Sequence, residues 1–301
     1  KTNNIDLSSL VKNKVINKNR SWLVHKNKAH NNGEVLENHL LRDKDFQEAI
    51  NNHGNIKRKI KIINTDRSVC ARISGEIASR YGNKGFNGNL DLFFEGAAGQ
   101  SFGAFALQGM NIKLVGEAND YVGKGINGGC ITVIPPIRNE ESGNQVILGN
   151  TCLYGATGGE LYALGRAGER FAVRNSGAIA VIEGAGDHCC EYMTGGVVVV
   201  LGKTGRNISA GMTGGLSFIL DEEEDLIEKV NQEIVEIHKI TNNEQELILR
   251  PLVENHFKRT NSSKAKEIIL NWNEWKNKFK LIVPPSEKDK VGLVELEQIL
   301  I

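Results

Sequence analysis

Two stretches late in the chain, Gly196-Val-Val-Val-Val-Leu201 and Gly215-Leu-Ser-Phe-Ile-Leu220, decide the fold. Each is a short apolar run that follows a glycine, and the same pattern recurs earlier, in runs that begin at Gly88, Gly109, Gly129, Gly159 and Gly177. Neighbouring runs start 18 to 21 residues apart, except for one interval of 30 that contains the polar segment 135–143, which we interpret as a loop. This period predicts one β-strand per repeat.

Glycine distinguishes the repeat from its flanks, because 27 of the 33 glycines lie between Gly88 and Gly215. Glycine costs about 1 kcal/mol relative to alanine inside a helix, so short strands joined by tight turns are predicted, and we expect corner glycines such as Gly196 to need positive φ. The pattern favours a parallel β-helix of seven turns over a leucine-rich repeat, which would need an asparagine ladder that is absent. A sandwich with glycine-rich turns is the alternative.

The composition of the 301 residues is that of a soluble, core-forming chain, with 40% hydrophobic and 24% charged residues. A net charge of +1 gives no global attraction to nucleic acid or to an anionic membrane. No apolar run approaches the roughly 20 residues that cross a bilayer. The five irregularly spaced cysteines indicate a reducing compartment, and a chain that begins at Lys1 instead of Met is expected to be a piece of a longer protein.

The segment ahead of the repeat is predicted to hold a helix over 43–52, a strand over 57–63 and a helix over 74–81. We interpret the basic run Lys57-Arg58-Lys59 as the exposed side of an edge strand rather than an anion-binding patch.

Two helices are predicted after the repeat. The first begins at Asp221 and presents Leu226, Val230, Ile234 and Ile237 on one stripe. The second begins near Ser263 and ends at the segment 281–285, and it carries the apolar residues Ala265, Ile268, Ile269, Trp272, Trp275 and Phe279. We expect its aromatic side chains to pack on the repeat or on a neighbour, not to stack on nucleic-acid bases.

Two short motifs suggest phosphate or dinucleotide binding, and neither fits. Gly123-Lys-Gly-Ile-Asn-Gly128 has the spacing of a dinucleotide fingerprint, but a strand follows it where a helix is required, so we interpret it as a repeat corner. Gly202-Lys203-Thr204 resembles the end of a phosphate loop, but Val197 stands where the first glycine is required.

The segment Asp187-His188-Cys189-Cys190-Glu191 places four kinds of metal-capable side chain together. If the segment is a strand, its alternating side chains prevent both cysteines from facing one ion, and a second ligand pair is missing, so buried thiol packing is the preferred interpretation. No Ser/His/Asp or Cys/His set can be identified. We therefore predict no catalytic, cofactor-binding or metal-binding residue on this chain.

Three longer motifs carry a family resemblance. They are Glu95-Gly-Ala-Ala-Gly-Gln-Ser-Phe-Gly-Ala104, Gly116-Glu-Ala-Asn-Asp-Tyr-Val-Gly-Lys-Gly125, and Gly184-Ala-Gly-Asp-His188 with Cys190-Glu-Tyr-Met-Thr-Gly-Gly196. They resemble the C-terminal GXGXG domain of the glutamate synthase large subunit. The similarity is strongest over 65–218, and it departs from the family at Cys189, where a small residue is expected.

The resemblance implies a mainly β fold: a right-handed parallel β-helix of about seven turns with a short N-terminal α/β lead-in and C-terminal helices. The corresponding domains are the lead-in 1–82, the GXGXG β-helix 83–220 and the helical tail 221–301. It also implies a non-catalytic structural role, in which this domain spaces an amidotransferase domain and an FMN synthase domain of the same parent chain. The parent makes glutamate from glutamine and 2-oxoglutarate with FMN and an iron–sulfur cluster, none of which is expected on this chain, so the isolated chain is expected to be inactive.

The segments Val283-Pro-Pro-Ser-Glu287 and 64–75 resemble the ferredoxin-dependent branch of the family. Ferredoxin is then a partner of the parent, and the richness in Asn, Lys and Ile favours a plastid stroma or a cyanobacterium-like cytoplasm. Nucleic acid and membrane are not expected partners. Two alternatives stay open: an autonomous β-helix that binds or hydrolyses a ligand, or a stand-alone GXGXG subunit of another oxidoreductase.

Overall fold

The computed structural model describes residues 5–11, 33–137, 140–240 and 243–288. The chain divides into two units, 1–34 and 35–301, and the first contains helix α1 (Ser8–Val11). The helices of the second unit are α2 (Leu36–Arg42), α3 (Lys44–Asn51), α4 (Ala71–Tyr81), α5 (Leu226–Lys229), α6 (Asn243–Thr260), α7 (Ser263–Leu270), α8 (Trp272–Trp275) and α9 (Pro285–Lys288). Its strands are β1 (Asn55–Ile62), β2 (Asn89–Ala98), β3 (Met110–Ala118), β4 (Asn127–Ile134), β5 (Val146–Leu148), β6 (Gly158–Ala163), β7 (Arg166–Ala167), β8 (Ser176–Ile182), β9 (Thr194–Val200), β10 (Gly214–Leu220), β11 (Glu236–Lys239) and β12 (Phe279–Val283).

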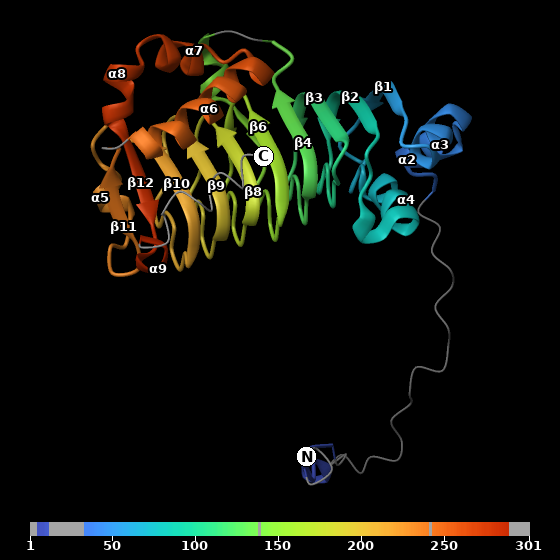
Figure 1. Cartoon of the computed structure of the whole chain (residues 1–301), viewed down its shortest axis with the longest axis horizontal. Coiled ribbons are helices and arrows are strands. Elements are labelled where there is room, and N and C mark those ends of the chain that lie inside the picture. The colour runs from blue at the N-terminus through green and yellow to red at the C-terminus, as the bar shows by residue number, and fades with distance from the viewer. Residues whose placement is uncertain (1–4, 12–32, 138–139, 241–242, 289–301) are drawn as a thin grey trace. The chain divides into compact units, whose positions relative to one another are not determined.

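These strands form one large, mostly parallel sheet (Figure 1). Its order is β1-β2-β3-β4-β6-β8-β9-β10-β12-β11, and every neighbouring pair from β1 to β10 is parallel. The last two strands pair antiparallel. The seven apolar runs of the repeat are confirmed as strands, one per period, but the described chain is mixed α/β, which is broader than the predicted mainly β class.

Each repeat returns to the sheet through a loop of unusual backbone conformation. In six successive loops three alternate residues have φ between 54° and 69°. The six triplets are Ser101/Gly103/Phe105, Tyr121/Gly123/Gly125, Thr151/Leu153/Gly155, Arg170/Ala172/Arg174, His188/Cys190/Tyr192 and Asn207/Ser209/Gly211. The left-handed region is costly for any residue with a Cβ, so these loops require compensation from their surroundings.

The compensation comes from hydrogen bonds between successive loops. The amide of Tyr121 donates to the carbonyl of Asn150 in the next loop, at 2.8 Å, and the amide of Gly123 donates to the carbonyl of Phe102 in the preceding loop, at 2.9 Å. The same alternation recurs along the repeat, where Cys190 donates backward to Phe171 and Tyr192 donates forward to Ala210. Each loop therefore satisfies backbone groups of both neighbours, as a strand in a sheet does.

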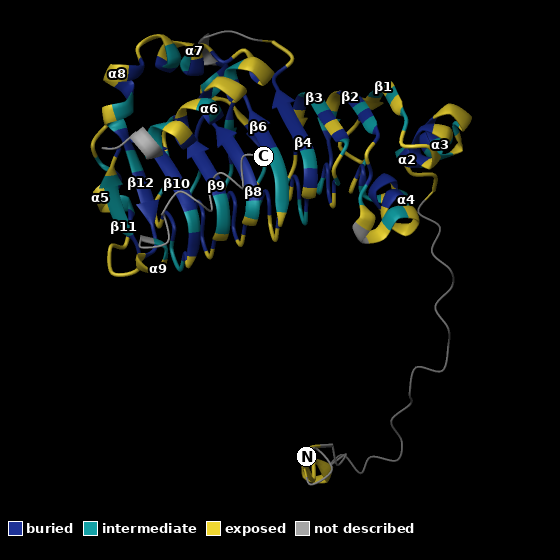
Figure 2. Cartoon of the chain, viewed as in Figure 1, coloured by how far each residue is buried: buried dark blue, intermediate teal, exposed yellow. Residues whose placement is uncertain are grey.

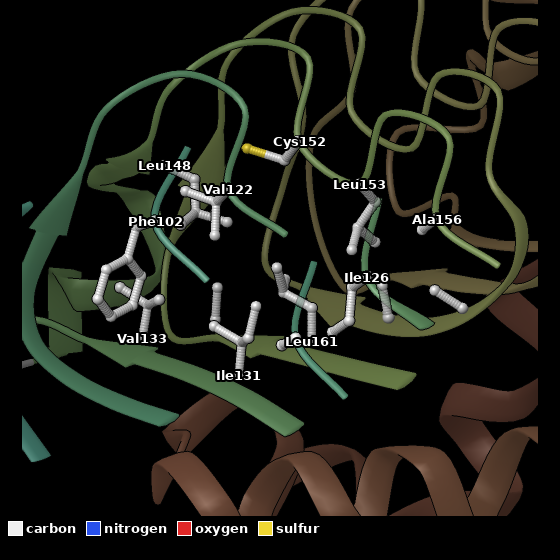
Figure 3. Close-up of a cluster of buried hydrophobic side chains, with 14 of the residues drawn as sticks. Phe102, Val122, Ile126, Ile131, Val133, Leu148, Cys152, Leu153, Ala156 and Leu161 are labelled. Atoms are coloured by element: carbon white, nitrogen blue, oxygen red, sulfur yellow. The ribbon is translucent and has the colours of Figure 1, made fainter. Parts of the chain in front are cut away.

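The middle of each loop also supplies the core. Figure 3 shows Val122 and Cys152 from the loops gathered with Ile131 and Leu161 from the strands. All four side chains are fully buried. The space between sheet and loops is therefore filled by apolar side chains.

The outer face of the sheet is covered along only part of its length. β2 and β3 alternate buried and partly exposed residues, whereas β8 and β9 end in continuous buried runs (Figure 2). The difference arises because α6 lies against β4, β6, β8 and β9. A second apolar cluster forms there, and it includes Val199, Phe218, Trp272, Trp275 and Phe279. The expected packing of the aromatic stripe onto the repeat is confirmed.

The lead-in contains the two predicted helices and the strand with shifted bounds, and also α2, which was not predicted. Helix α3 is capped by Asp43, whose carboxylate accepts from the amides of Asp45 and Phe46. The basic run lies in β1 at the end of the sheet with Lys57 exposed, so the edge-strand interpretation is confirmed. Helix α4 begins at Ala71, three residues earlier than predicted, because the Glu37 carboxylate accepts from the amides of Arg72 and Ile73.

The helix predicted from Asp221 is wrong. Only α5 is helical, Val230 bridges Ile208, and Ile237 lies in β11. The apolar residues Leu226, Val230 and Val235 are buried in the same cluster as the interior of the repeat. Covering the last loop buries this apolar surface better than a continuous helix stripe would, so tertiary packing overrides the helical period.

The second tail helix is shorter than predicted, and a longer helix precedes it. Residues 263–275 form α7 and α8, but Phe279 begins β12, which pairs antiparallel with β10. The 18-residue α6 was not predicted, because it contains Pro251 and has no clean apolar stripe. Its buried residues lie on one face, but that face includes the polar His256 and Thr260 while the apolar Leu247 is exposed, so the apolar period is weak.

Replacement by alanine at two glycines, one at a corner and one in a helix, tests the corner geometry. Gly196 has φ of 84°, and a Cβ there would collide with the carbonyl oxygen of Ala178, whereas Gly75 is exposed in α4 with open space around it. We expect Gly196→Ala to lower the free energy of unfolding by about 1–3 kcal/mol. Gly75→Ala should raise it by about 0.5–1 kcal/mol. Urea unfolding midpoints check both, and equal midpoints would contradict the corner at Gly196.

Candidate functional site

The segment Asp187–Glu191 is the densest group of reactive side chains that the sequence singled out, and it lies in one of the loops. The assumption that it forms a strand is wrong, because His188 and Cys190 have φ of 63° and 60°. In this conformation the two thiols do approach, with their Sγ atoms 3.7 Å apart. Both are fully buried, and the Cys190 Sγ lies 3.5 Å from the Ser217 hydroxyl, so the interpretation as buried thiol packing is confirmed.

The two carboxylates of the segment pair with arginines from outside it. Arg206 binds Asp187 through both its amide and its guanidinium, which hold the pKa of that carboxyl below its ordinary value. The buried carboxylate of Glu191 lies 3.3 Å from the Arg170 guanidinium and 3.4 Å from the His188 ring. The two thiols are buried in the core, whereas Asp187, His188 and Glu191 contact charged groups. The five side chains therefore do not converge on one possible metal position.

The phosphate-loop fragment at Lys203 lies beside a cavity of about 170 Å³ whose charged lining residues are mostly acidic. Asp221, Glu222, Glu223 and Asp225 face it together with Lys203 and Lys229. Lys203 pairs with Glu223 at 2.5 Å, and this contact raises the pKa of the lysine. Four carboxylates against two lysines oppose an anionic ligand, so the cavity does not suit phosphate.

The structure brings together one polar cluster that sequence reasoning missed. The Glu183 Oε1 atom lies 3.1 Å from His256 Nε2, and the Ser262 hydroxyl donates to the same oxygen. Glu183 follows β8, whereas its partners lie 73 and 79 residues later, at the end of α6 and before α7. In the sequence, the only sign of this cluster is that the charged Glu183 directly follows the apolar run 178–182.

This cluster has the residue types of a hydrolase triad but the wrong order. The carboxylate lies between the imidazole and the hydroxyl, whereas nucleophilic catalysis needs the imidazole to contact the hydroxyl directly. His256 and Ser262 are also completely buried, which denies a substrate access. The hydroxyl caps α7 by accepting from the Ala265 amide. The cluster therefore joins the helical tail to the sheet.

A shallow groove of about 550 Å³ is lined by residues from several repeats. It is lined mainly by glycines, among them the pairs 128–129, 158–159 and 195–196. Its one carboxylate, Glu160, pairs with Arg259 at 3.3 Å. Glycoside hydrolysis ordinarily needs two carboxylates that flank the bond, so this groove offers no such pair.

Within the described residues, no group of three or more His, Cys, Asp or Glu side chains could hold a metal ion. In the same part of the chain, no helix is both long and apolar enough to span a membrane. The prediction that this chain carries no catalytic, cofactor-binding or metal-binding residue stays a prediction.

Comparison with known proteins identifies relatives of nearly the whole chain. Residues 37–285 match the GXGXG motif family. The chain is 57% identical over 290 residues to ferredoxin-dependent glutamate synthase 2 of Synechocystis sp.. It is 52% identical over 293 residues to the chloroplastic ferredoxin-dependent glutamate synthase of Spinacia oleracea, and 54% identical over 288 residues to that of Pyropia yezoensis.

These alignments cover 95–96% of this chain but only 18–19% of each relative. The chain therefore spans about one fifth of the length of the curated relatives it matches. The resemblance to glutamate synthase, and to its ferredoxin-dependent type, is confirmed.

The thiols provide one test of the buried packing. Burial raises the pKa of Cys130 and of Cys152 to about 12, and the neighbouring Cys190 thiol together with burial raises the pKa of Cys189 well above its ordinary value. At pH 8 we expect the native chain to react negligibly with a disulfide reagent such as DTNB, because the reactive thiolate is scarce and inaccessible. All five cysteines should react in denaturant. Rapid native reaction of two thiols would contradict the buried pair.

A second test compares neighbouring serines. Ser262→Ala removes the cap of α7 and a hydrogen bond to buried Glu183, so we expect a loss of about 1–3 kcal/mol in the free energy of unfolding. Ser263→Ala changes an exposed residue and should be nearly silent. Thermal unfolding measures both, and a silent Ser262→Ala would show that the cluster does not secure the tail.

Proposed function

Because this chain belongs to the GXGXG motif family and is homologous to that region of ferredoxin-dependent glutamate synthases, we propose that it is the structural C-terminal domain of such an enzyme. Its work is to hold an amidotransferase domain and an FMN synthase domain in a constant relation, so that ammonia released from glutamine passes internally to the site that forms glutamate. The observation that carries the proposal is the match of 96% of this chain to one fifth of a much longer protein.

A rigid spacer needs a scaffold whose parts do not shift against one another. The stacked repeats supply it, since each strand and each loop is hydrogen-bonded to the next. We propose that they form a right-handed parallel β-helix of about seven turns, flanked by the lead-in 1–82 and the tail 221–301. Stacked strands lie about 4.8 Å apart, so seven turns separate the ends by about 30 Å.

The chemistry of the parent is proposed to lie outside this chain. An iron–sulfur cluster is held by four cysteine thiolates, whereas the five cysteines here are buried, and only Cys189 and Cys190 contact one another. The residues present do not fit the cluster. FMN and the glutamine nucleophile are likewise assigned to the other four fifths of the parent.

The alternative of an autonomous hydrolytic β-helix has less support. It requires an open groove with two convergent carboxylates, and the glycine-lined groove has only Glu160, engaged by Arg259. A stand-alone subunit of another oxidoreductase would share the fold but would not explain identities of 52–57% to glutamate synthases. The same relatives support ferredoxin as a partner of the parent and a cyanobacterial or plastid location.

The spacer role is testable in the full-length parent. A specific protease site inserted between residues 34 and 35, at the boundary of the two units, allows unit 35–301 to be cut from the rest. We expect the cut unit to co-elute with the remainder and glutamate formation with reduced ferredoxin to continue. Once separated in mild denaturant and returned to buffer, the unit should be colourless and inactive, while the remainder should hydrolyse glutamine without matching glutamate formation.

Two results would contradict the proposal. One is a cut unit that elutes alone while the remainder keeps coupled activity, because the unit would then hold nothing together. The other is flavin that stays with the separated unit in stoichiometric amount.

A further inference from the structure

A line of large exposed side chains follows the outer corner of the loops. It consists of Phe105, Tyr154, Arg174 and Tyr192, which we call the aromatic ridge. Exposed fractions are 51% for Phe105, 36% for Tyr154 and 57% for Tyr192, although each belongs to a residue type that favours burial. We infer that this ridge is the surface through which the chain docks against another folded domain of the longer polypeptide, an inference that rests on the proposed function.

The backbone geometry places three of these residues at equivalent positions of their loops. The amide of Phe105 donates to the carbonyl of Lys124 in the next loop, and the amide of Gly125 donates to the carbonyl of Tyr154 in the loop after that. Arg174 donates in the same way to Glu191, the residue before Tyr192. Phe105, Arg174 and Tyr192 are each the third positive-φ residue of their loops, and Tyr154 lies one residue before that position. Gly125 and Gly155 occupy it in the two loops between Phe105 and Arg174, so the ridge follows one corner of the loops, with Arg174 and Tyr192 on adjacent loops.

Glycines beside the ridge hold two of its rings in place. A Cβ on Gly125 would come within 2.7 Å of the Phe105 ring, and a Cβ on Gly211 would come within 2.5 Å of the Tyr192 ring. Each ring therefore lies over the backbone of the next loop, on a surface that only glycine leaves free. This contact orders the rings before any partner binds, which lowers the entropy lost on association.

The chemistry of the ridge is that of a protein interface. Tyrosine, phenylalanine and arginine are enriched at interfaces, and tyrosine and arginine are frequent among the residues whose truncation costs the most binding energy. Among the described residues, no carboxylate lies within ion-pair distance of Arg174, although the nearby Arg170 and Arg206 are paired with Glu191 and Asp187. The ridge thus suits a surface that offers apolar side chains and a carboxylate.

Another domain of the same polypeptide is the occupant that the observations favour. The chain makes up about one fifth of its relatives, so the remaining four fifths are tethered to it and present at high local concentration. A net charge of +1 gives no support for a nucleic acid, although aromatic and arginine side chains could contact one. Association of two copies through this strip is the competing outcome.

The test uses the full-length parent with the cleavable site between residues 34 and 35. The ridge variant carries Phe105→Ala, Arg174→Ala and Tyr192→Ala. The control carries Leu247→Ala and Leu270→Ala, which truncate exposed side chains on α6 and α7. After cleavage, the dissociation constant of the cut unit from the remainder is measured by dilution and analytical gel filtration, and the melting temperature of each uncut protein reports folding.

We expect the ridge variant to bind at least about tenfold more weakly than wild type, the usual scale for loss of several hot-spot side chains, and the control to bind as wild type does. Tyr192→Phe keeps the ring and should retain binding, which separates docking from a folding defect. Arg174→Glu should weaken binding further than Arg174→Ala.

Wild-type affinity of a folded ridge variant, with weaker binding by the control, would overturn the inference and leave the spacer role standing. A wild-type unit that does not associate with the remainder at all would overturn both. If the ridge variant changes only the association of whole parents with one another, the strip joins two copies and the inference is wrong.

Discussion

The repeat depends on hydrogen bonding between successive loops in which every second residue has a left-handed backbone conformation. Along each loop the amides point in turn to the preceding and to the following repeat, as Gly123 to Phe102 and Tyr121 to Asn150 demonstrate. A sheet on one side and hydrogen-bonded loops on the other hold every repeat in register with its neighbours. The cost of φ near 60° at Leu153 or Tyr192 is acceptable because the alternative is a buried amide without a partner.

The flanking segments cover the two ends of the stack and part of its outer face. β1 closes one end with exposed lysines that discourage further pairing, while β12 and β11 finish the other with antiparallel strands. The long helix α6 covers the outer face and is secured by Glu183, His256 and Ser262. The covered and uncovered portions explain why burial alternates in β3 and is continuous in β9.

The hydrogen-bonded stack supports the proposed role of this chain as a spacer. In the segment 187–191, Asp187 is paired with Arg206, and the thiols of Cys189 and Cys190 are buried in the core. The loop surface presents large exposed side chains, such as Phe105 and Tyr192, whose rings lie over neighbouring glycines. Such a surface suits the contact of domains within a large enzyme, where orientation and spacing matter more than chemistry on the spacer itself.

The sequence alone determined the repeat, because a local period of glycines and apolar residues reflects local backbone geometry. It also determined the edge character of β1, the cap at Asp43 and the family through its long motifs. The tertiary structure decided the rest. Residues 221–240 have a helical period yet cover the last loop, and α6 has no clear apolar stripe because its buried face includes the polar His256 and Thr260. The approach of Glu183 to His256, the αL loop at Cys190 and the alignment of Phe105 with Tyr192 arise only when distant repeats stack, since the contacts that stabilise them lie a full repeat or more away in sequence.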